Sequence, residues 1–152
     1  AAAIRGFEAK IQEVAALAAF IPVVLGLSGN VGVQSSTLVV RGLAMGQLDV
    51  AALPAAIWAE SKVVAGIAVA CSVAVLGITY ALGGKNLLLA GAVTNALMCS
   101  MMFAAVVGTT VPMLAQRFGV DPALVTGPAL TTANDFIGVV IYFAICSVWL
   151  GL

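Results

Sequence analysis

The sequence has no histidine and few charged residues, and these absences limit the chemistry that the chain can perform. Only 8% of the residues are charged, whereas an ordinary soluble domain has about 25%. A serine hydrolase that uses histidine as its base is excluded, because no histidine is present. The six basic and six acidic residues form no run of either sign. The sequence therefore gives no indication of a nucleic-acid partner.

Several motifs that carry catalysis or energy coupling are also absent. The chain has no nucleotide-binding G-x-x-x-x-G-K-[ST] sequence and no potassium-filter TVGYG sequence. An intramembrane aspartyl protease needs two carboxylates in one site, and the last apolar segment has only one. The cysteines Cys71, Cys99 and Cys146 lie far apart without a C-x-x-C pair, which argues against a zinc site or a disulfide framework. We therefore predict that the protein is not an enzyme.

Long apolar segments make up much of the chain and predict a membrane protein. Hydrophobic residues account for 63% of the sequence, and its mean hydropathy is +1.20. A spanning helix needs about 20 apolar residues, so 152 residues can supply four spans and short connections. We predict one all-α domain over residues 1–152, a polytopic membrane helix bundle. Its expected spans are 11–45, which we expect to be broken, 60–82, 87–114 and 122–152.

The first expected span has a polar, glycine-rich centre at Leu27–Thr37. With Pro22 shortly before it, this segment predicts a broken or strongly kinked helix. Irregular backbone at membrane depth is tolerated only where it is buried in protein or lines a watery cavity, and transport proteins use such breaks to bind ions. Asn30 and Gln34 are therefore candidate pore-lining residues. The alternative is a tight helix-packing corner in which side-chain amides satisfy the backbone.

A single carboxylate, Asp135, lies inside the last apolar segment. A charged aspartate at the centre of a membrane helix costs about 2.5–3.5 kcal/mol on insertion scales, so it normally faces a bundle interior or an aqueous path. The alternative is a buried carboxylate that is held by hydroxyl groups and serves packing alone. Helical spacing predicts that small and polar residues share one face with Asp135 and line a pore: Gly127, Thr131, Asn134, Gly138 and Tyr142.

Two other helical faces indicate contacts between helices or with a pathway. Asn95 in the third expected span shares a face with Thr109 and two methionines. It either adds an amide group to a pore lining or makes an interhelical hydrogen bond. The second expected span has one face of small residues, which is typical of helix packing: Gly66, Ala70, Gly77 and Ala81.

The residue types around Asp135 favour a hard divalent cation. Carboxylate, hydroxyl and carbonyl oxygens suit magnesium, calcium or manganese better than zinc or copper. Magnesium keeps several of its waters and is often held by one or two carboxylates. A two-fold symmetric dimer would place two Asp135 side chains opposite each other, and four helices are few for enclosing a pore alone. We therefore expect a homodimer with a central pore, surrounded by lipid.

Two segments, Pro22–Gly46 and Val111–Phe143, resemble the transmembrane domain of the MgtE family of magnesium channels. The first has the sequence PVVLGLSGNVGVQSSTLVVRGLAMG and the second VPMLAQRFGVDPALVTGPALTTANDFIGVVIYF. Together they cover more than a third of the chain. The resemblance implies a multi-pass protein of the plasma (inner) membrane, with five helices per subunit. It also implies that hydrated magnesium passes through the centre of a homodimer.

The resemblance further implies roles for individual residues. The aspartate of the family's last helix, which binds the ion, matches Asp135, and a main-chain carbonyl one turn earlier falls at Thr131. A side-chain position two turns earlier falls at Gly127, which has no amide to offer. The segment around Asn30 corresponds to pore lining near a cytoplasmic gate. Asp121 matches an acidic position that helps to bind regulatory metal at the cytosolic mouth.

Two departures from the family pattern are expected. The family's first helix is missing except for its exit around Ile4–Phe7, and the family's cytosolic regulatory domains are absent. Manganese, cobalt and calcium are the expected substitutes for magnesium. Two other functions stay open as alternatives. One is a proton-coupled secondary transporter of a small organic substrate, with Asp135 as proton relay, and the other is a non-transporting membrane scaffold.

Overall fold

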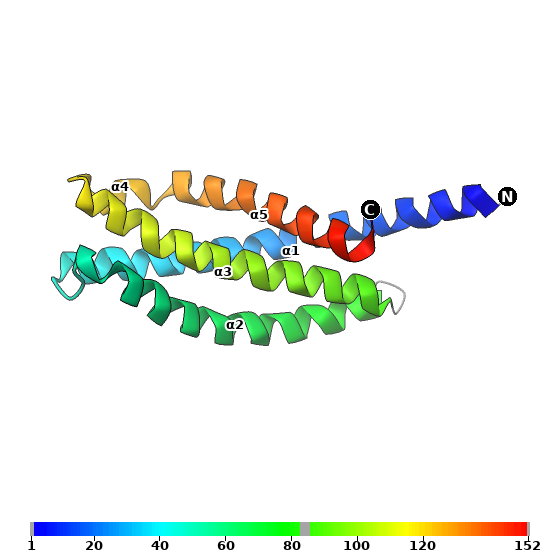
Figure 1. Ribbon diagram of the computed structural model, residues 1–152, viewed down its shortest axis with the longest axis horizontal. Helices are drawn as coiled ribbons and strands as arrows, with labels where there is room; N and C mark the ends of the chain where they lie inside the picture. Colours follow the sequence, from blue (N-terminus) through cyan, green and yellow to red (C-terminus); the bar gives the residue numbers. More distant parts are fainter. Residues whose placement is uncertain (1, 83–85, 152) are drawn as a thin grey trace.

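The computed structural model describes residues 2–82 and 86–151 of the chain, with side chains from residue 15 onward. Every regular element in these ranges is helical (Figure 1), which confirms the prediction of an all-α fold. Four helices are long and apolar enough to cross a membrane. The elements are α1 (Ala2–Ala44), the 3-10 helix η1 (Val50–Ala52), α2 (Leu53–Leu82), α3 (Leu87–Arg117), α4 (Pro122–Val125) and α5 (Pro128–Leu150).

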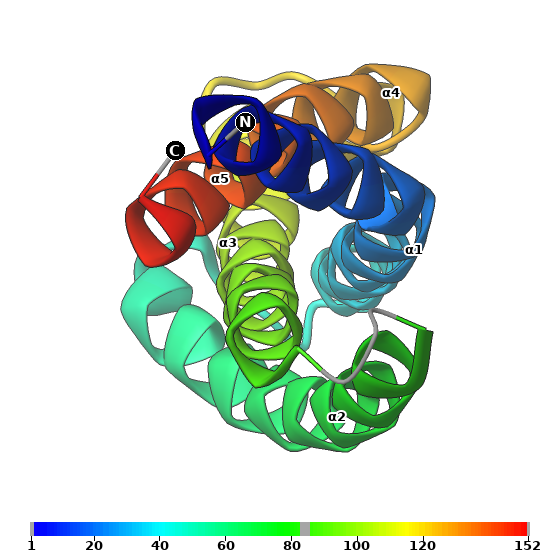
Figure 2. The same ribbon diagram turned by 90° about the vertical axis from the view of Figure 1, so that its right-hand side faces the viewer.

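Helix α3 lies at the centre of the bundle. Viewed along the long axis of the molecule, α1, α2 and α5 are arranged around it (Figure 2), and it packs against all three. Its buried surface is rich in alanine, including Ala92, Ala96 and Ala104, and small side chains let neighbouring backbones approach closely. The N-terminal part of α1 extends beyond the other helices (Figure 1). The core therefore surrounds α3, and the other long helices each keep an exposed face.

Helices α1 and α5, the first and last of the long helices, contact each other directly. The Tyr142 hydroxyl donates a hydrogen bond to the Leu17 carbonyl oxygen at 2.9 Å, and both residues are buried. Gly138 lets α5 approach α1 closely, because a Cβ at this position would lie 3.1 Å from Leu25 Cδ2. These contacts hold two segments that are far apart in the sequence side by side.

Helix α1 is continuous, so the predicted break at Leu27–Thr37 is wrong. Three hydroxyl groups of this segment bond to carbonyl oxygens of the same helix, as when Ser28 Oγ donates to Val24 O at 2.8 Å, whereas Ser35 Oγ donates to Glu60 Oε1 of α2. The glycines permit close packing: a Cβ on Gly108 of α3 would lie 2.5 Å from Gly32 O. One face of the segment is therefore a helix-packing surface, and the hydrogen bonds of the helix itself satisfy its backbone.

The predicted span 122–152 is divided instead. Helix α4 is a single turn whose N-cap is Asp121, and Asp121 Oδ1 accepts a hydrogen bond from Ala123 N at 2.9 Å. Gly127 then separates α4 from α5, with φ −90° and ψ −137°. Because Pro128 follows, steric clash with the proline ring disfavours the helical region for Gly127. The break in helical structure therefore lies just before α5, the last long helix, and not within α1, the first.

Smaller predictions also differ from the structure. Helix α2 begins at Leu53 rather than 60, because the apolar residues 53–59 before Glu60 also belong to the helix. Helix α3 ends at Arg117 rather than 114, because the helix continues into the polar residues Gln116 and Arg117. Ile4–Phe7, compared above with the exit of another helix, lies within α1. The small-residue face of α2 is exposed and is not a packing surface within the described chain: Gly66, Ala70, Gly77 and Ala81.

Candidate functional site

A groove with a volume of about 200 Å³ lies between α1 and α5. Helix α5 contributes a carboxylate and a hydroxyl group, and α1 contributes an amide, two glycines and apolar side chains. The structure thereby brings together three of the predicted site residues, Asp135, Thr131 and Asn30. The complete lining is Leu25, Gly26, Gly29, Asn30, Val33, Thr131 and Asp135.

The carboxylate of Asp135 lies against the bare backbone of Gly29. A Cβ on Gly29 would lie 3.5 Å from Asp135 Oδ1, the one atom of another helix that it would meet within 4 Å. Asp135 itself is half-buried. The residues that the structure describes contain no group of three or more His, Cys, Asp or Glu side chains that could hold a metal ion. One chain therefore offers a cation in this groove a single carboxylate, together with neutral oxygens and water.

Thr131 lies one turn before Asp135 on α5 and is half-buried. Its hydroxyl donates to the Gly127 carbonyl at 3.5 Å, and its N–H donates to the same carbonyl at 3.3 Å. Since donation uses only the hydroxyl hydrogen, the Thr131 oxygen keeps lone pairs that can accept from water in the groove. Gly127 is the N-cap of α5 and is not part of the groove lining.

Asn30 and Gln34 lie four residues apart on an exposed face of α1. Asn30 lines the groove, whereas Gln34 lies one turn further along α1 and outside the lining. Because the helix is unbroken around these residues, its backbone carbonyls are used within the helix. The polar groups that α1 presents to the groove are therefore side-chain groups, and the expected contribution from irregular backbone is not found in this segment.

Asn134 and Gly138, which the sequence predicts to line a pore, are not among the residues that line the groove. Asn134 is 3% exposed, and its amide lies against Gly32 of α1. Gly138 is buried against Leu25 and Ser28, also of α1. Helical spacing grouped the polar residues of α5 on one face, but it does not show that α1 covers one edge of that face. Asp135 and Thr131 are on the edge that stays open.

Asn95 lies apart from the groove, on an exposed face of α3. The thiol of Cys99, one turn later, donates to Asn95 Oδ1 at 3.9 Å, and α3 contributes no residue to the groove. Thr109, predicted on the same face, is buried and donates its hydroxyl to Ala105 O at 2.8 Å. Among the residues that the structure describes, Asn95 therefore neither lines the groove nor bonds to another helix.

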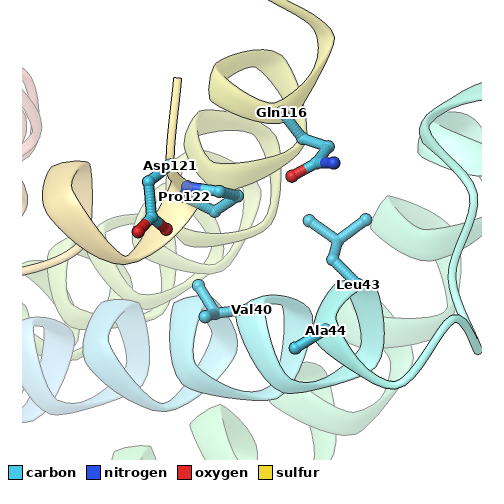
Figure 3. Close-up of a pocket in the computed structure, with 6 residues that line it drawn as sticks. All are labelled: Val40, Leu43, Ala44, Gln116, Asp121 and Pro122. Atoms are coloured by element: carbon cyan, nitrogen blue, oxygen red, sulfur yellow. The ribbon is translucent and has the colours of Figure 1, made fainter. Parts of the chain in front are cut away.

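Asp121 belongs to a second hollow, with a volume of about 210 Å³, near the end of α1 and the start of α4 (Figure 3). One of its carboxylate oxygens caps α4. An amide from the end of α3 reaches the same hollow, and the remaining walls are largely apolar. No residue lines both hollows, so the structure separates Asp121 from Asp135. The lining is Val40, Leu43, Ala44, Gln116, Asp121 and Pro122.

The sequence prediction omitted four residues that line the groove. Gly26 and Gly29 have a sequence signal, since they stand one turn apart beside Asn30, but glycines at this spacing are also typical of a broken helix. Leu25 and Val33 have no such signal, because an apolar side chain that borders a groove has the same spacing as one that faces lipid.

Comparison with known proteins supports the family resemblance. Residues 21–145 match the family described as MgtE, divalent cation transporter. The chain is 33% identical over 144 residues to the magnesium transporter MgtE of Bacillus subtilis, covering 95% of this chain and 32% of that protein. It is 38% identical over 142 residues to the magnesium transporter MgtE of Thermus thermophilus, covering 93% and 31%. For the magnesium transporter MgtE of Enterococcus faecalis the identity is 35% over 152 residues, covering 99% and 33%.

The chain spans about a third of the length of the curated relatives it matches. The matched residues 21–145 include every residue that lines the groove. The family is described as one of transporters, which agrees with the prediction that the protein is not an enzyme. The match to the family extends over far more than half of the sequence, and the fold has the membrane-capable helices that a transporter needs. The chain therefore belongs to the MgtE family of divalent cation transporters.

Proposed function

We propose that this chain forms the membrane pore of a magnesium channel in which Asp135 binds the hydrated ion. The groove supports the proposal most directly, because a carboxylate, a hydroxyl and an amide from two helices line one space there. Oxygen groups of this kind are the ones that magnesium prefers. The three relatives are magnesium transporters by name, and they share this region of sequence.

The size of the groove fits an ion that keeps its water. Magnesium has octahedral coordination and gives up its waters reluctantly. The groove has a volume of about 200 Å³, well above the roughly 10–15 Å³ that one water needs, so it has room for several waters around an ion. Asp135 then acts through the water shell, with its negative charge close to the ion. A single carboxylate in each chain is sufficient for this kind of binding.

A second copy of the chain completes the path in this proposal. Asn30 is exposed at the edge of the groove, so two copies related by a two-fold axis can bring two grooves and two Asp135 carboxylates together. Lipid covers the remaining exposed apolar faces. An interior-negative potential favours entry of a divalent ion by about 4.6 kcal/mol per 100 mV, taking roughly 2.3 kcal/mol per charge. Uptake across the plasma (inner) membrane then needs no nucleotide-binding site.

The second hollow has a different role in the proposal. Asp121 binds a regulatory metal ion there, at the cytosolic mouth of the pore, with its uncapped carboxylate oxygen and the Gln116 amide oxygen as the available ligands. Magnesium is the expected ion at this position too. Manganese, cobalt and calcium are the substitutes to compare at both places, since each accepts oxygen ligands to a different degree.

Ion flux into proteoliposomes tests the proposal. Asp135→Asn removes the negative charge and keeps the size of the side chain. We expect the wild-type protein to carry saturable, potential-driven magnesium flux and Asp135→Asn to lose it. Thr132→Ala is the matched control, because Thr132 is an exposed residue of the same helix whose hydroxyl bonds to Pro128 O at 2.8 Å.

Three results would contradict the proposal. Unchanged magnesium flux in Asp135→Asn would show that magnesium transport does not need the carboxylate. Flux that follows a proton gradient and does not need magnesium would indicate a secondary transporter. No flux of magnesium, manganese or calcium in the wild-type protein, together with normal folding of Asp135→Asn, would indicate a scaffold.

A further inference from the structure

The buried face of α5 contains one amide, Asn134, among small and apolar residues. Asn134 is 3% exposed, and its Oδ1 has no hydrogen-bond partner among the residues that the structure describes. A buried amide oxygen without a partner destabilises a fold. Packing energy alone does not account for asparagine here, because an apolar side chain of similar volume would avoid that cost.

The amide of Asn134 occupies the space that a side chain on Gly32 would fill. A Cβ on Gly32 would overlap Asn134 Nδ2 and would lie 3.6 Å from Ala104 O of α3. Gly32 is itself held against α3, because a Cβ on Gly108 would lie 2.5 Å from Gly32 O. Three helices therefore meet at one level. We refer to the space beside Gly32, near Ala104 O, that receives the Asn134 side chain as the amide notch.

The amide notch adjoins the carboxylate of the groove along both helices. Asn134 and Asp135 are neighbours on α5, and Gly32 lies about one turn from Gly29, which contacts the Asp135 carboxylate. Successive residues of a helix point about 100° apart. A rotation of α5 that takes Asn134 out of the notch therefore also turns Asp135 relative to the groove. The seated amide fixes the direction in which the carboxylate points.

We propose that Asn134 is a positioning residue, whose side chain in the amide notch sets the rotation of α5 that presents Asp135 to the ion. The role of Asp135 rests on the proposed function, but the direction of the side chain at position 135 can be measured without magnesium. Asn134 makes no contact with the ion in this proposal. Gly32 contributes by having no side chain, since a larger residue there would fill the notch. Gly108 contributes by letting α3 approach the backbone of Gly32.

Magnesium flux in a double-mutant cycle tests the proposal. Gly32→Ala closes the notch and Asn134→Ala removes the amide, so each is expected to raise the magnesium concentration for half-maximal flux by about tenfold, which corresponds to about 1.4 kcal/mol. In the double variant the new methyl group takes the space left by the amide. We expect its half-maximal concentration to be no higher than that of Asn134→Ala alone. Gly66→Ala on α2, where a Cβ would meet nothing within 4 Å, is the control.

Two outcomes of this cycle would overturn the proposal. The first is a Gly32→Ala variant that folds and has the wild-type half-maximal concentration. The second is a double variant in which the two single effects multiply, because independent effects would mean that the methyl group and the amide do not compete for one space. If Gly32→Ala does not fold, the half-maximal magnesium concentration of Asn134→Ala tests the proposal without it, since this substitution removes atoms and creates no overlap. A wild-type half-maximal concentration in that variant also overturns the proposal.

A thiol at position 135 gives a readout that does not depend on magnesium. Asp135→Cys is placed in a chain whose native cysteines, Cys71, Cys99 and Cys146, are replaced by alanine, and its rate of modification by a charged methanethiosulfonate is measured. We expect Gly32→Ala to slow modification about tenfold and added Asn134→Ala to restore it. Equal rates with and without Gly32→Ala overturn the positioning role. A slowed rate, together with no magnesium flux in the wild-type protein, supports positioning while it contradicts the proposed function.

Discussion

The pair α1–α5 and the pair α2–α3 use the same small residues in different ways. Gly29 and Gly32 of α1 lie against side chains of α5, so that a Cβ on either would meet Asp135 or Asn134. Gly66 and Gly77 of α2 lie in open space, where a Cβ would meet nothing within 4 Å. Glycine at helical spacing therefore marks a close contact between helices only where another helix fills the space that the missing side chain leaves.

Polar residues differ between the two pairs in the same way. Ser72, Thr79 and Ser100 of α2 and α3 are buried hydroxyl residues without a hydrogen-bond partner in the described structure. Asn30 and Asp135 of α1 and α5 instead border open space. The α2–α3 contact is closely packed and buried, whereas the α1–α5 contact leaves a groove with room for water. The following variants test that division, from the largest expected effect to the smallest.

Gly108→Ala should cause the largest loss of stability. Its Cβ would lie 2.5 Å from Gly32 O, a backbone atom that cannot move without shifting α1. We expect the free energy of unfolding to fall by about 3 kcal/mol, the upper end of the usual cost of overpacking. Gly66→Ala should leave stability unchanged or raise it by up to about 1 kcal/mol, because alanine favours helix over glycine. Denaturant unfolding in detergent measures both, and equal stability of the two variants would contradict the comparison.

Ser35→Ala should weaken the attachment of α1 to α2. Ser35 Oγ donates to Glu60 Oε1 at 2.7 Å, across the two helices. A hydrogen bond to a charged group contributes about 1.5–3 kcal/mol, and we expect a loss near 1.5 kcal/mol because Glu60 is only half-buried. Ser36→Ala is the control, since Ser36 Oγ bonds within its own helix to Val33 O at 2.9 Å. In the same unfolding measurement, Ser35→Ala should have a clearly lower free energy of unfolding than Ser36→Ala. The reverse order would show that the Ser35–Glu60 hydrogen bond does not stabilise the fold.

Gly29→Ala should impair ion binding without impairing folding. The added methyl would lie 3.5 Å from Asp135 Oδ1, an ordinary contact that displaces water from the carboxylate. We expect the half-maximal magnesium concentration to rise about threefold, equivalent to roughly 0.7 kcal/mol. Gly26→Ala, in the same groove but with nothing within 4 Å of its Cβ, should have a smaller effect. Proteoliposome flux distinguishes them, and a larger effect at Gly26 would show that the carboxylate is approached from another side.

Thr131→Ala should have the smallest effect, about a twofold rise in the half-maximal magnesium concentration. Its hydroxyl oxygen can accept one hydrogen bond from a water of the ion's shell, and water can replace much of that interaction. Thr132→Ala, at an exposed position next to it, should match the wild-type protein in the same flux measurement. Equal affinities in the two variants would place the Thr131 side chain outside the ion's surroundings.

The sequence predicts the helical fold and the central groove residues well, for simple physical reasons. Long apolar segments in a chain with few charges can form only membrane helices. A lone carboxylate in such a segment needs a polar environment, and Asp135 does lie on a groove with Thr131 and Asn30. These features depend on local composition and on the cost of burying charge, which a single sequence displays.

The remaining features depend on contacts between distant segments, which periodicity does not show. Asn134 and Asp135 are adjacent polar residues, and it is Asn134 that lies against Gly32 of α1 and is covered. The glycines of α1 were interpreted as helix breakers, although a glycine before proline is the stronger local signal. That signal is present at Gly127, directly before Pro128, where the structure has its break.

The hydrogen bond between Tyr142 and Leu17 joins residues that are 125 positions apart. A ribosome that adds about 5–20 residues per second needs roughly 6–25 s to make the chain between them. During that interval α1 has been synthesised while α5 has not, and Asn30 has no opposing carboxylate. The groove between α1 and α5 is therefore the last part of this bundle to assemble at the translocation site. A nascent chain that stopped after α3 would contain the centre of the bundle and only one wall of the groove.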